Sequence, residues 1–144
     1  MLIADDDEND RALIRLAISR NRIPVETREV HDGVEAIRYL QGEGEYSDRE
    51  KNPFPGLLLV DLKMPRMDGL GVLEWVRTHP DCSFLPTVML SGSGHEGDIL
   101  EAHRRGVKAY FVKPNDLHEL EKIVGIVAEH WARAKRPEMP QKCK

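Results

Sequence analysis

One carboxylate in this chain stands at the end of an apolar run. Leu57 to Val60 are all apolar, and Asp61 follows them directly. Prolines and a glycine bound the run, so it has the length of a short strand, and its unbroken apolar character is typical of a strand covered on both faces of a parallel sheet. Open α/β sheets bind ligands beyond the carboxyl ends of their strands, so Asp61 is expected to lie in a functional site.

Three further strand-like runs also end in polar side chains. The first four residues lead into the aspartates Asp5 to Asp7, and two later runs end in Ser91 and Lys113. Because Mg²⁺ takes oxygen ligands, usually one or two carboxylates together with phosphate oxygens, Asp6 and Asp61 suit this cation. Crowded carboxylates repel one another unless a cation neutralises them. A lysine ammonium and a serine hydroxyl can both donate to phosphate oxygens, so Lys113 and Ser91 complete a set suited to a phosphoryl group.

These motifs resemble those of the receiver domains of two-component response regulators, of which CheY is the single-domain type. The resemblance extends from Met1 to about Trp131. It is carried by Asp5 and Asp6, Asp61 with Met64-Pro65 and Asp68-Gly69, Ser91 after Thr87-Val-Met-Leu90, and Tyr110-Phe-Val-Lys-Pro114.

The resemblance implies a metal site around the acceptor. The residue that matches Asp61 accepts a phosphoryl group from a sensor histidine kinase. The carboxylates of Asp5, Asp6 and Asp61 then hold Mg²⁺ together with the main-chain carbonyl of Lys63.

The resemblance also implies a switch. Lys113 pairs with the phosphate, and Ser91 and Tyr110 match a hydroxyl and an aromatic residue that shift on phosphorylation. The implied function is a phosphoacceptor that switches a protein-binding surface. It is not an enzyme, apart from weak autophosphatase activity.

Hydrophobic periodicity alternates between strand and helix five times, which predicts βαβ units in a parallel sheet. The resemblance selects a doubly wound five-stranded α/β sheet of order 2-1-3-4-5, the flavodoxin-like (CheY-like) fold, which is the order general for this class. The expected strands are 1–4, 25–30, 57–60, 87–91 and 109–113, and the expected helices are 11–21, 32–42, 70–79, 98–105 and 116–131.

Composition sets bounds on function. The length of 144 residues predicts one domain, which the resemblance identifies as a receiver domain over 1–134, followed by a flexible tail over 135–144. The net charge of −4 gives no field that favours nucleic acid or an anionic membrane. No signal peptide or membrane span is visible in the sequence. The two cysteines, Cys82 and Cys143, are far apart in the chain and in no metal spacing, which indicates a reducing compartment, so the protein is expected in the cytoplasm.

Two features indicate a subfamily and its partners. The connection 42–56 is longer than the roughly 2–6 residues usual between a helix and a strand, and the last helix is long, as in regulators paired with bacterial and cyanobacterial phytochromes. The expected partners are a sensor histidine kinase, such as a phytochrome, and a downstream protein or histidine phosphotransfer protein. The edge strand with Tyr110 and Phe111, next to Trp131, further predicts a homodimer through the fourth helix, fifth strand and fifth helix.

Other interpretations remain open for the same residues. A Mg²⁺-dependent phosphatase with an aspartate nucleophile would need a second acid two residues after Asp61, where Lys63 stands. A receiver used only as an interaction module would not need the acids. The acids after the first strand are also compatible with a helix cap, Lys113 with a solvated lysine, Ser91 with a turn residue and Tyr110 with a core residue.

Overall fold

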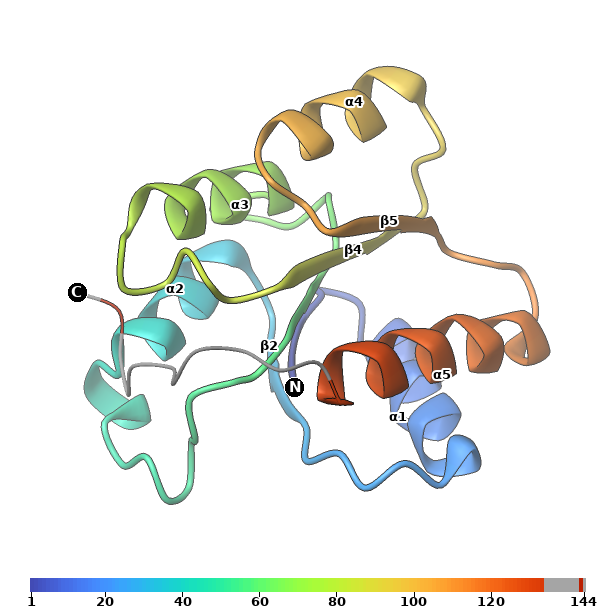
Figure 1. Ribbon diagram of the computed structural model, residues 1–144, viewed down its shortest axis with the longest axis horizontal. Helices are drawn as coiled ribbons and strands as arrows, with labels where there is room; N and C mark the ends of the chain where they lie inside the picture. The colour runs from blue at the N-terminus through green and yellow to red at the C-terminus, as the bar shows by residue number, and fades with distance from the viewer. Residues whose placement is uncertain (134–142, 144) are drawn as a thin grey trace.

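The structure is a computed structural model that describes residues 1–133 and residue 143. Five parallel strands form one sheet in the order β2-β1-β3-β4-β5, as predicted. Within the described residues, four α-helices and one short 3-10 helix connect the strands, and a fifth α-helix follows the last strand (Figure 1). The elements are β1 (Leu2–Ala4), α1 (Glu8–Asn21), β2 (Arg28–Val30), α2 (Gly33–Gln41), η1 (Gly44–Tyr46), β3 (Leu58–Val60), α3 (Gly69–Thr78), β4 (Thr87–Ser91), α4 (Glu96–Arg104), β5 (Ala109–Val112) and α5 (Leu117–Arg133).

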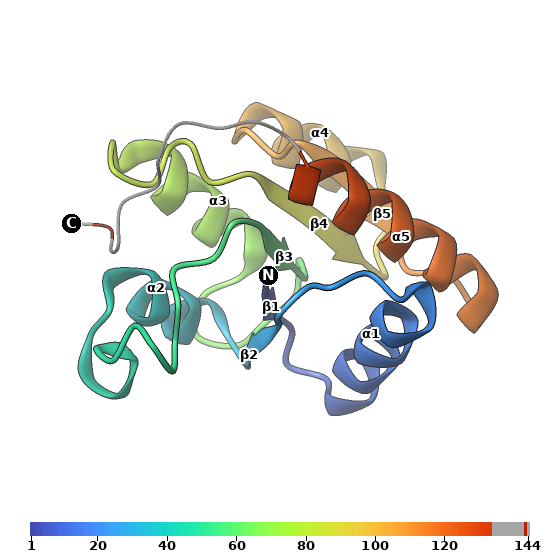
Figure 2. The ribbon, with the colours of Figure 1, turned by 60° about the horizontal axis from the view of Figure 1, so that its bottom comes forward.

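The helices cover the sheet from both sides, with α1 and α5 on one face and α2, α3 and α4 on the other (Figure 2). Alternating side chains of each strand feed two separate cores, because successive residues of a strand point to opposite faces. In β1, Leu2 and Ala4 pack in the core under α2 and α3, and Ile3 packs in the core under α1 and α5. All three are fully buried, as expected for a strand covered on both faces.

Several element boundaries differ from the predictions. Helix α1 begins at Glu8 rather than at residue 11, because the Asp7 side chain caps it by accepting hydrogen bonds from the N–H groups of Asn9 and Asp10. Strand β2 is confined to Arg28–Val30, where it pairs with β1, rather than covering 25–30. Helix α4 begins at Glu96, two residues earlier than expected, and β5 ends at Val112, one residue before Lys113.

The long connection 42–56 is an ordered part of the fold. The guanidinium of Arg49 donates to the carbonyl oxygens of Leu40 and Asn52, each at 3.0 Å, and lies over the ring of Tyr39. The buried Tyr46 hydroxyl donates to a carboxylate oxygen of Glu35 at 2.7 Å. The connection therefore packs onto α2.

Cys143 is held against the α2 and α3 side of the molecule. Its N–H donates to the carbonyl oxygen of Leu40 at 2.9 Å, and its side chain forms a disulfide with Cys82, with 5.5 Å between the two Cα atoms. Both cysteines are buried. The sequence analysis did not predict this pairing, because 61 residues of chain separate the two cysteines and only the fold brings them together. The rest of the predicted tail, 135–142 and 144, lies outside the described residues.

Candidate functional site

The carboxyl ends of β1, β3 and β5 bring three acids and one lysine together. Asp5 follows β1 and is 2% exposed, Asp61 follows β3 and is 8% exposed, and Asp6 beside them is exposed to solvent. Carboxylate oxygens of these three aspartates all lie within 4.8 Å of one another. The convergence follows from the parallel register in which β1 pairs with β3, so that both strands deliver their next residue to the same edge.

Lys113 bridges these acids from the other side of the site. Its Nζ atom donates to Asp5 Oδ2 at 2.9 Å and to Asp61 Oδ2 at 3.2 Å. A third carboxylate, Asp10 of α1, accepts from the same Nζ at 2.7 Å. The backbone N–H of Lys113 is fixed by the carbonyl oxygen of Ser91 at 2.7 Å, which ties the lysine to the end of β4.

Burial and charge set the protonation of the site. Removal from water raises the pKa of the Asp61 carboxyl, the negative charge of Asp5 adds to that rise, and the Lys113 ammonium opposes it. Burial likewise raises the pKa of Asp5 against the hydrogen bond from Lys113. Burial by itself lowers the pKa of Lys113, but its hydrogen bonds to Asp10 and Asp5 and the charge of Asp61 hold that pKa above its usual range. Lys113 therefore stays positively charged.

The carboxylate cluster fits a hard divalent cation. One ammonium cannot balance the charges of Asp5, Asp6, Asp10 and Asp61, and carboxylate oxygens are the ligands that Mg²⁺ prefers. Asp61 keeps a defined orientation, because its Oδ1 accepts from the N–H of Leu62 at 2.8 Å. The structure thus brings together three of the four predicted ligand residues, and the role of the Lys63 carbonyl, two residues beyond Asp61 on the surface, stays a prediction.

The loop after Asp61 is shaped by its contacts with α2 and α3. Gly69 begins α3 at a point where any Cβ would clash with the carbonyl oxygen of Asp61, which explains why glycine stands there. Arg66 adopts a left-handed conformation, with φ at 64°, and its guanidinium pairs with the carboxylate of Asp32 at 2.8 Å. These contacts fix the path of the chain just beyond the acceptor candidate.

The two switch candidates meet through one residue of the loop after β4. The hydroxyl of Ser91, 2% exposed, accepts from the N–H of Ser93 at 3.2 Å. The hydroxyl of Tyr110, a half-buried residue of β5, donates to the carbonyl oxygen of the same Ser93 at 2.7 Å. Ser91 and Tyr110 therefore share a partner without touching each other in the described contacts.

Sequence reasoning missed Asp10, although it assigned Asp5 and Asp6 to the site. Asp7 is the helix cap, whereas Asp5 and Asp6 belong to the carboxylate cluster. The acidic run therefore contains both a helix cap and site residues. Asp10 stands three residues after the cap Asp7, a spacing that indicates a helix start rather than a site. The sequence held no signal that would direct its carboxylate to Lys113.

Comparisons with known proteins agree with this geometry. The sequence model of the family described as "Response regulator receiver domain" matches residues 1–125. Response regulator Rcp1 of Synechocystis sp. is 32% identical over 131 residues, which cover 91% of this chain and 87% of Rcp1.

Solved structures give the same result. The phosphorylated cyanobacterial phytochrome response regulator RcpA superposes with a TM-score of 0.86 at 35% identity, covering 95% of this chain and 96% of RcpA. The response regulator RPA3017, in red light signalling of R. palustris, gives a TM-score of 0.89 at 30% identity. The match covers 96% of this chain and 97% of RPA3017. The Mn²⁺-bound form of response regulator Rcp1 is also similar, with a TM-score of 0.82 and 32% identity. The match covers 95% of this chain and 97% of Rcp1.

Proposed function

This chain belongs to the response regulator receiver domain family, and we propose that Asp61 is the residue through which it accepts a phosphoryl group from a sensor histidine kinase. The observation that carries the proposal is the contact of one lysine ammonium, Lys113 Nζ, with both Asp61 and Asp5 in a cluster of three carboxylates. Membership of the family favours a phosphoacceptor over the phosphatase alternative, in which Lys63 occupies the place of the second acid.

The proposed reaction is a direct transfer to the carboxylate. An oxygen of Asp61 attacks phosphorus, the bond between phosphorus and the histidine nitrogen breaks, and the nitrogen keeps the electron pair of that bond. The product is an acyl phosphate on Asp61. The Lys113 ammonium, already 3.2 Å from Asp61 Oδ2, stabilises the negative charge on the transferred oxygens, which is the main protein contribution in such reactions. Attack of water on the acyl phosphate later returns the free carboxylate, giving weak autophosphatase activity.

The proposed cofactor is Mg²⁺, held by Asp5, Asp6, Asp61 and the carbonyl of Lys63. The donor set supports it, because three acidic side chains offer oxygens within 4.8 Å of one another. When bound, the cation would neutralise the acids and the charge of the phosphoryl oxygens. The chain itself also orients the acceptor carboxylate, because the backbone N–H of Leu62 donates to Asp61 Oδ1.

The proposed switch runs through Ser91 and Tyr110. A phosphoryl group on Asp61 is a new dianion, which recruits the nearest hydroxyl donors. Movement of Ser91 toward the phosphoryl group would break its hydrogen bond with the N–H of Ser93. Ser93 could then move, and its carbonyl oxygen is the acceptor for the Tyr110 hydroxyl. A beryllofluoride-bound structure in which both side chains keep their present contacts would contradict this switch.

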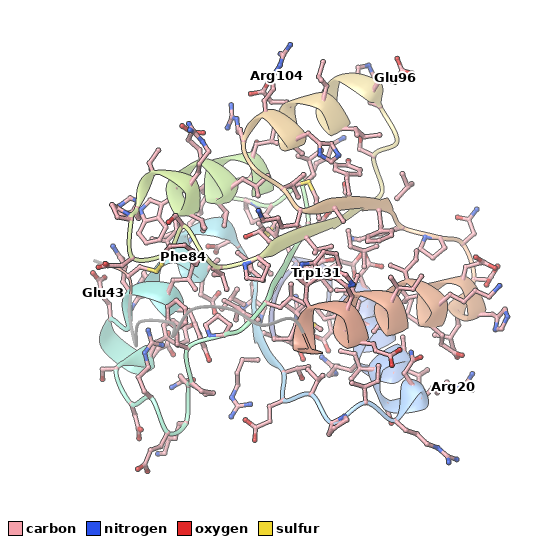
Figure 3. All side chains as sticks on the ribbon, in the orientation of Figure 1. Arg20, Glu43, Phe84, Glu96, Arg104 and Trp131 are labelled. Carbon is pink, nitrogen blue, oxygen red and sulfur yellow. A yellow bond between two sulfur atoms is a disulfide. The ribbon has the colours of Figure 1, made fainter. Side chains whose placement is uncertain are left out.

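The proposed partners are a phytochrome-type histidine kinase, a downstream protein or histidine phosphotransfer protein, and a second copy of the chain. The kinase type is supported by the phytochrome regulators among the similar proteins. The dimer surface would be α4, β5 and α5, where Leu100, Val112 and Ile126 are 53%, 44% and 59% exposed. Figure 3 shows Glu96 and Arg104 pointing outward from α4 beside this surface.

The dimer is tested by sedimentation with and without beryllofluoride. Leu100→Glu and Ile126→Glu place charge on the proposed interface without entering the core, and Phe84→Glu is a control, because Phe84 is 60% exposed outside these three elements. A wild type that stays monomeric at tens of micromolar in both conditions rules the dimer out.

We also propose a cytoplasmic location. No helix of the described residues is long and apolar enough to cross a bilayer.

The acceptor is tested by labelling with acetyl phosphate followed by mass spectrometry. Asp61→Asn should abolish the phosphoryl adduct, which we expect at about one per chain in the wild type. Asp68→Asn is a matched control, because Asp68 lies in the same loop and an asparagine can still cap α3. Labelling that survives Asp61→Asn, or that is lost equally in Asp68→Asn, would refute the assignment.

A further inference from the structure

Asp10 makes the shortest of the three contacts to Lys113. Its Oδ2 atom lies 2.7 Å from Lys113 Nζ, against 2.9 Å for Asp5 and 3.2 Å for Asp61. We propose that Asp10 is a positioning residue for phosphoryl transfer, which holds the Lys113 ammonium beside the acceptor. This inference rests on the proposed phosphoacceptor function and adds a residue to it.

Asp10 differs from the other two partners in what else it does. Asp5 and Asp61 belong to the carboxylate cluster that would hold the cation, and Asp10 does not. Two of the three carboxylates that bind Lys113 would therefore be shared with the proposed cation. Asp10 is the partner that stays available to Lys113 when the other two carry that second charge.

The orientation of Asp10 is not explained by capping of its helix. A glutamate or glutamine three residues after a cap can reach back to the N–H of the cap residue, in a capping box. Here that residue is Asp7, and its N–H donates to Asp5 Oδ1 at 2.9 Å. The place of a capping partner is thus taken by Asp5, and the Asp10 carboxylate is directed to Lys113.

Lys113 needs such an anchor because its side chain is long. Its backbone is fixed through the bond from its N–H to the Ser91 carbonyl oxygen, but four rotatable bonds separate that point from the ammonium. Asp10 lies in the first turns of α1, a helix that packs on α5 through contacts such as that of Asn21 with the Glu121 carbonyl oxygen. The anchor is therefore part of a helix that is itself packed on α5.

Removing the Asp10 carboxylate should let the ammonium move and slow the transfer. The rate of phosphorylation by acetyl phosphate in Asp10→Asn should fall on the order of three- to tenfold, the scale of effect expected when a charged group is loosened rather than removed. Asp10→Glu keeps the charge and should restore most of the rate. Glu119→Gln is the control, because it removes one acidic charge from α5, where Glu119 pairs with Lys122.

A second measurement separates positioning from a general structural effect. The Lys113 ammonium hydrogens are followed by ¹H–¹⁵N NMR in metal-free protein at low temperature. Their exchange with water should be several-fold faster in Asp10→Asn than in the wild type and unchanged in Glu119→Gln. If Asp10→Asn does not fold, as judged by circular dichroism, Asp10→Ser takes its place.

The outcomes are distinct. A slower rate together with faster ammonium exchange supports the inference. An unchanged or faster rate overturns it, as does a slower rate with unchanged exchange. The proposed function is judged separately by Asp61→Asn: if that variant is still labelled, the acceptor assignment fails whatever Asp10 does.

Discussion

Replacing Lys113 by methionine should destabilise the metal-free protein and make it more dependent on Mg²⁺. The substitution keeps an unbranched side chain of similar length and removes only the ammonium. Three contacts of 2.7 to 3.2 Å are lost, to carboxylates whose side chains are 3% (Asp5), 33% (Asp10) and 9% (Asp61) exposed.

The size of the effect follows from this burial. Removing one partner of a buried ion pair costs about 3–5 kcal/mol, because the other charge stays buried without compensation. Two of the three acids here meet that condition, whereas Asp10 is open to water and the 19% exposed Lys113 is not fully desolvated. The buried acids can also take up protons. We therefore expect a loss of about 2–3 kcal/mol in the free energy of unfolding at neutral pH.

Urea unfolding followed by circular dichroism measures this loss, first in EDTA and then in saturating Mg²⁺. Mg²⁺ at about one hundred times its dissociation constant adds about 2.7 kcal/mol to either protein. At equal concentration it should add more to Lys113→Met, because the ammonium no longer occupies oxygens of Asp5 and Asp61. Equal stabilities in EDTA, or a difference between the proteins that is as large in Mg²⁺ as in EDTA, would refute the reasoning.

Three further predictions concern acids and cysteines. Because burial raises the pKa of Asp61 above its ordinary value of 3.8, the folded state binds more protons than the unfolded state in the pH range between 3.8 and the raised pKa, so this group's contribution to stability is lost as pH rises through that range. The stability of metal-free Asp61→Asn relative to the wild type should therefore increase from about pH 4 upward, and a flat difference would contradict this. Asp6→Ala should weaken Mg²⁺ binding, measured by calorimetry, far more than Asp7→Ala, which should mainly cost about 1 kcal/mol of stability through loss of the α1 cap; equal effects would mean that the ligands are misassigned. Cys143→Ala should lower the free energy of unfolding by about 4 kcal/mol under oxidising conditions, since the link to Cys82 spans 61 residues, and the two proteins should converge in reductant.

The sequence predicted the site well where chain direction alone decides it. Parallel strands bring their carboxyl ends to one edge, so Asp5, Asp61 and Lys113 were expected at the same edge once β1, β3 and β5 were recognised as strands. The strand order came from family resemblance, because right-handed crossovers alone leave more than one arrangement. The ends of the helices were less predictable. The first residue of α1 depends on which of several adjacent acids caps the helix, and the sequence does not show which one does.

What the sequence did not predict depends on side-chain direction and long-range packing. Asp10 carries the pattern of a helix start, and its bond to Lys113 appears only when α1 is placed against the end of β5. The pairing of Cys82 with Cys143 likewise has no local signature. The sequence analysis inferred a reducing compartment from the spacing of the cysteines along the chain. That spacing does not show whether the fold brings the two thiols together. In a reducing cytoplasm the pair would be a transient link rather than a permanent one.

The link between Cys82 and Cys143 also makes half of the molecule a covalent ring. The ring contains β4, α4, β5 and α5, and with them Ser91, Tyr110 and Lys113, whereas the acids Asp5 and Asp61 lie on the open part of the chain. A single proteolytic cut between α4 and β5 would leave one connected molecule on a non-reducing gel. A cut in the connection 42–56 would instead part the strand that leads to Asp5 from the strand that leads to Asp61, so the halves of the acidic cluster would be held together by folding alone.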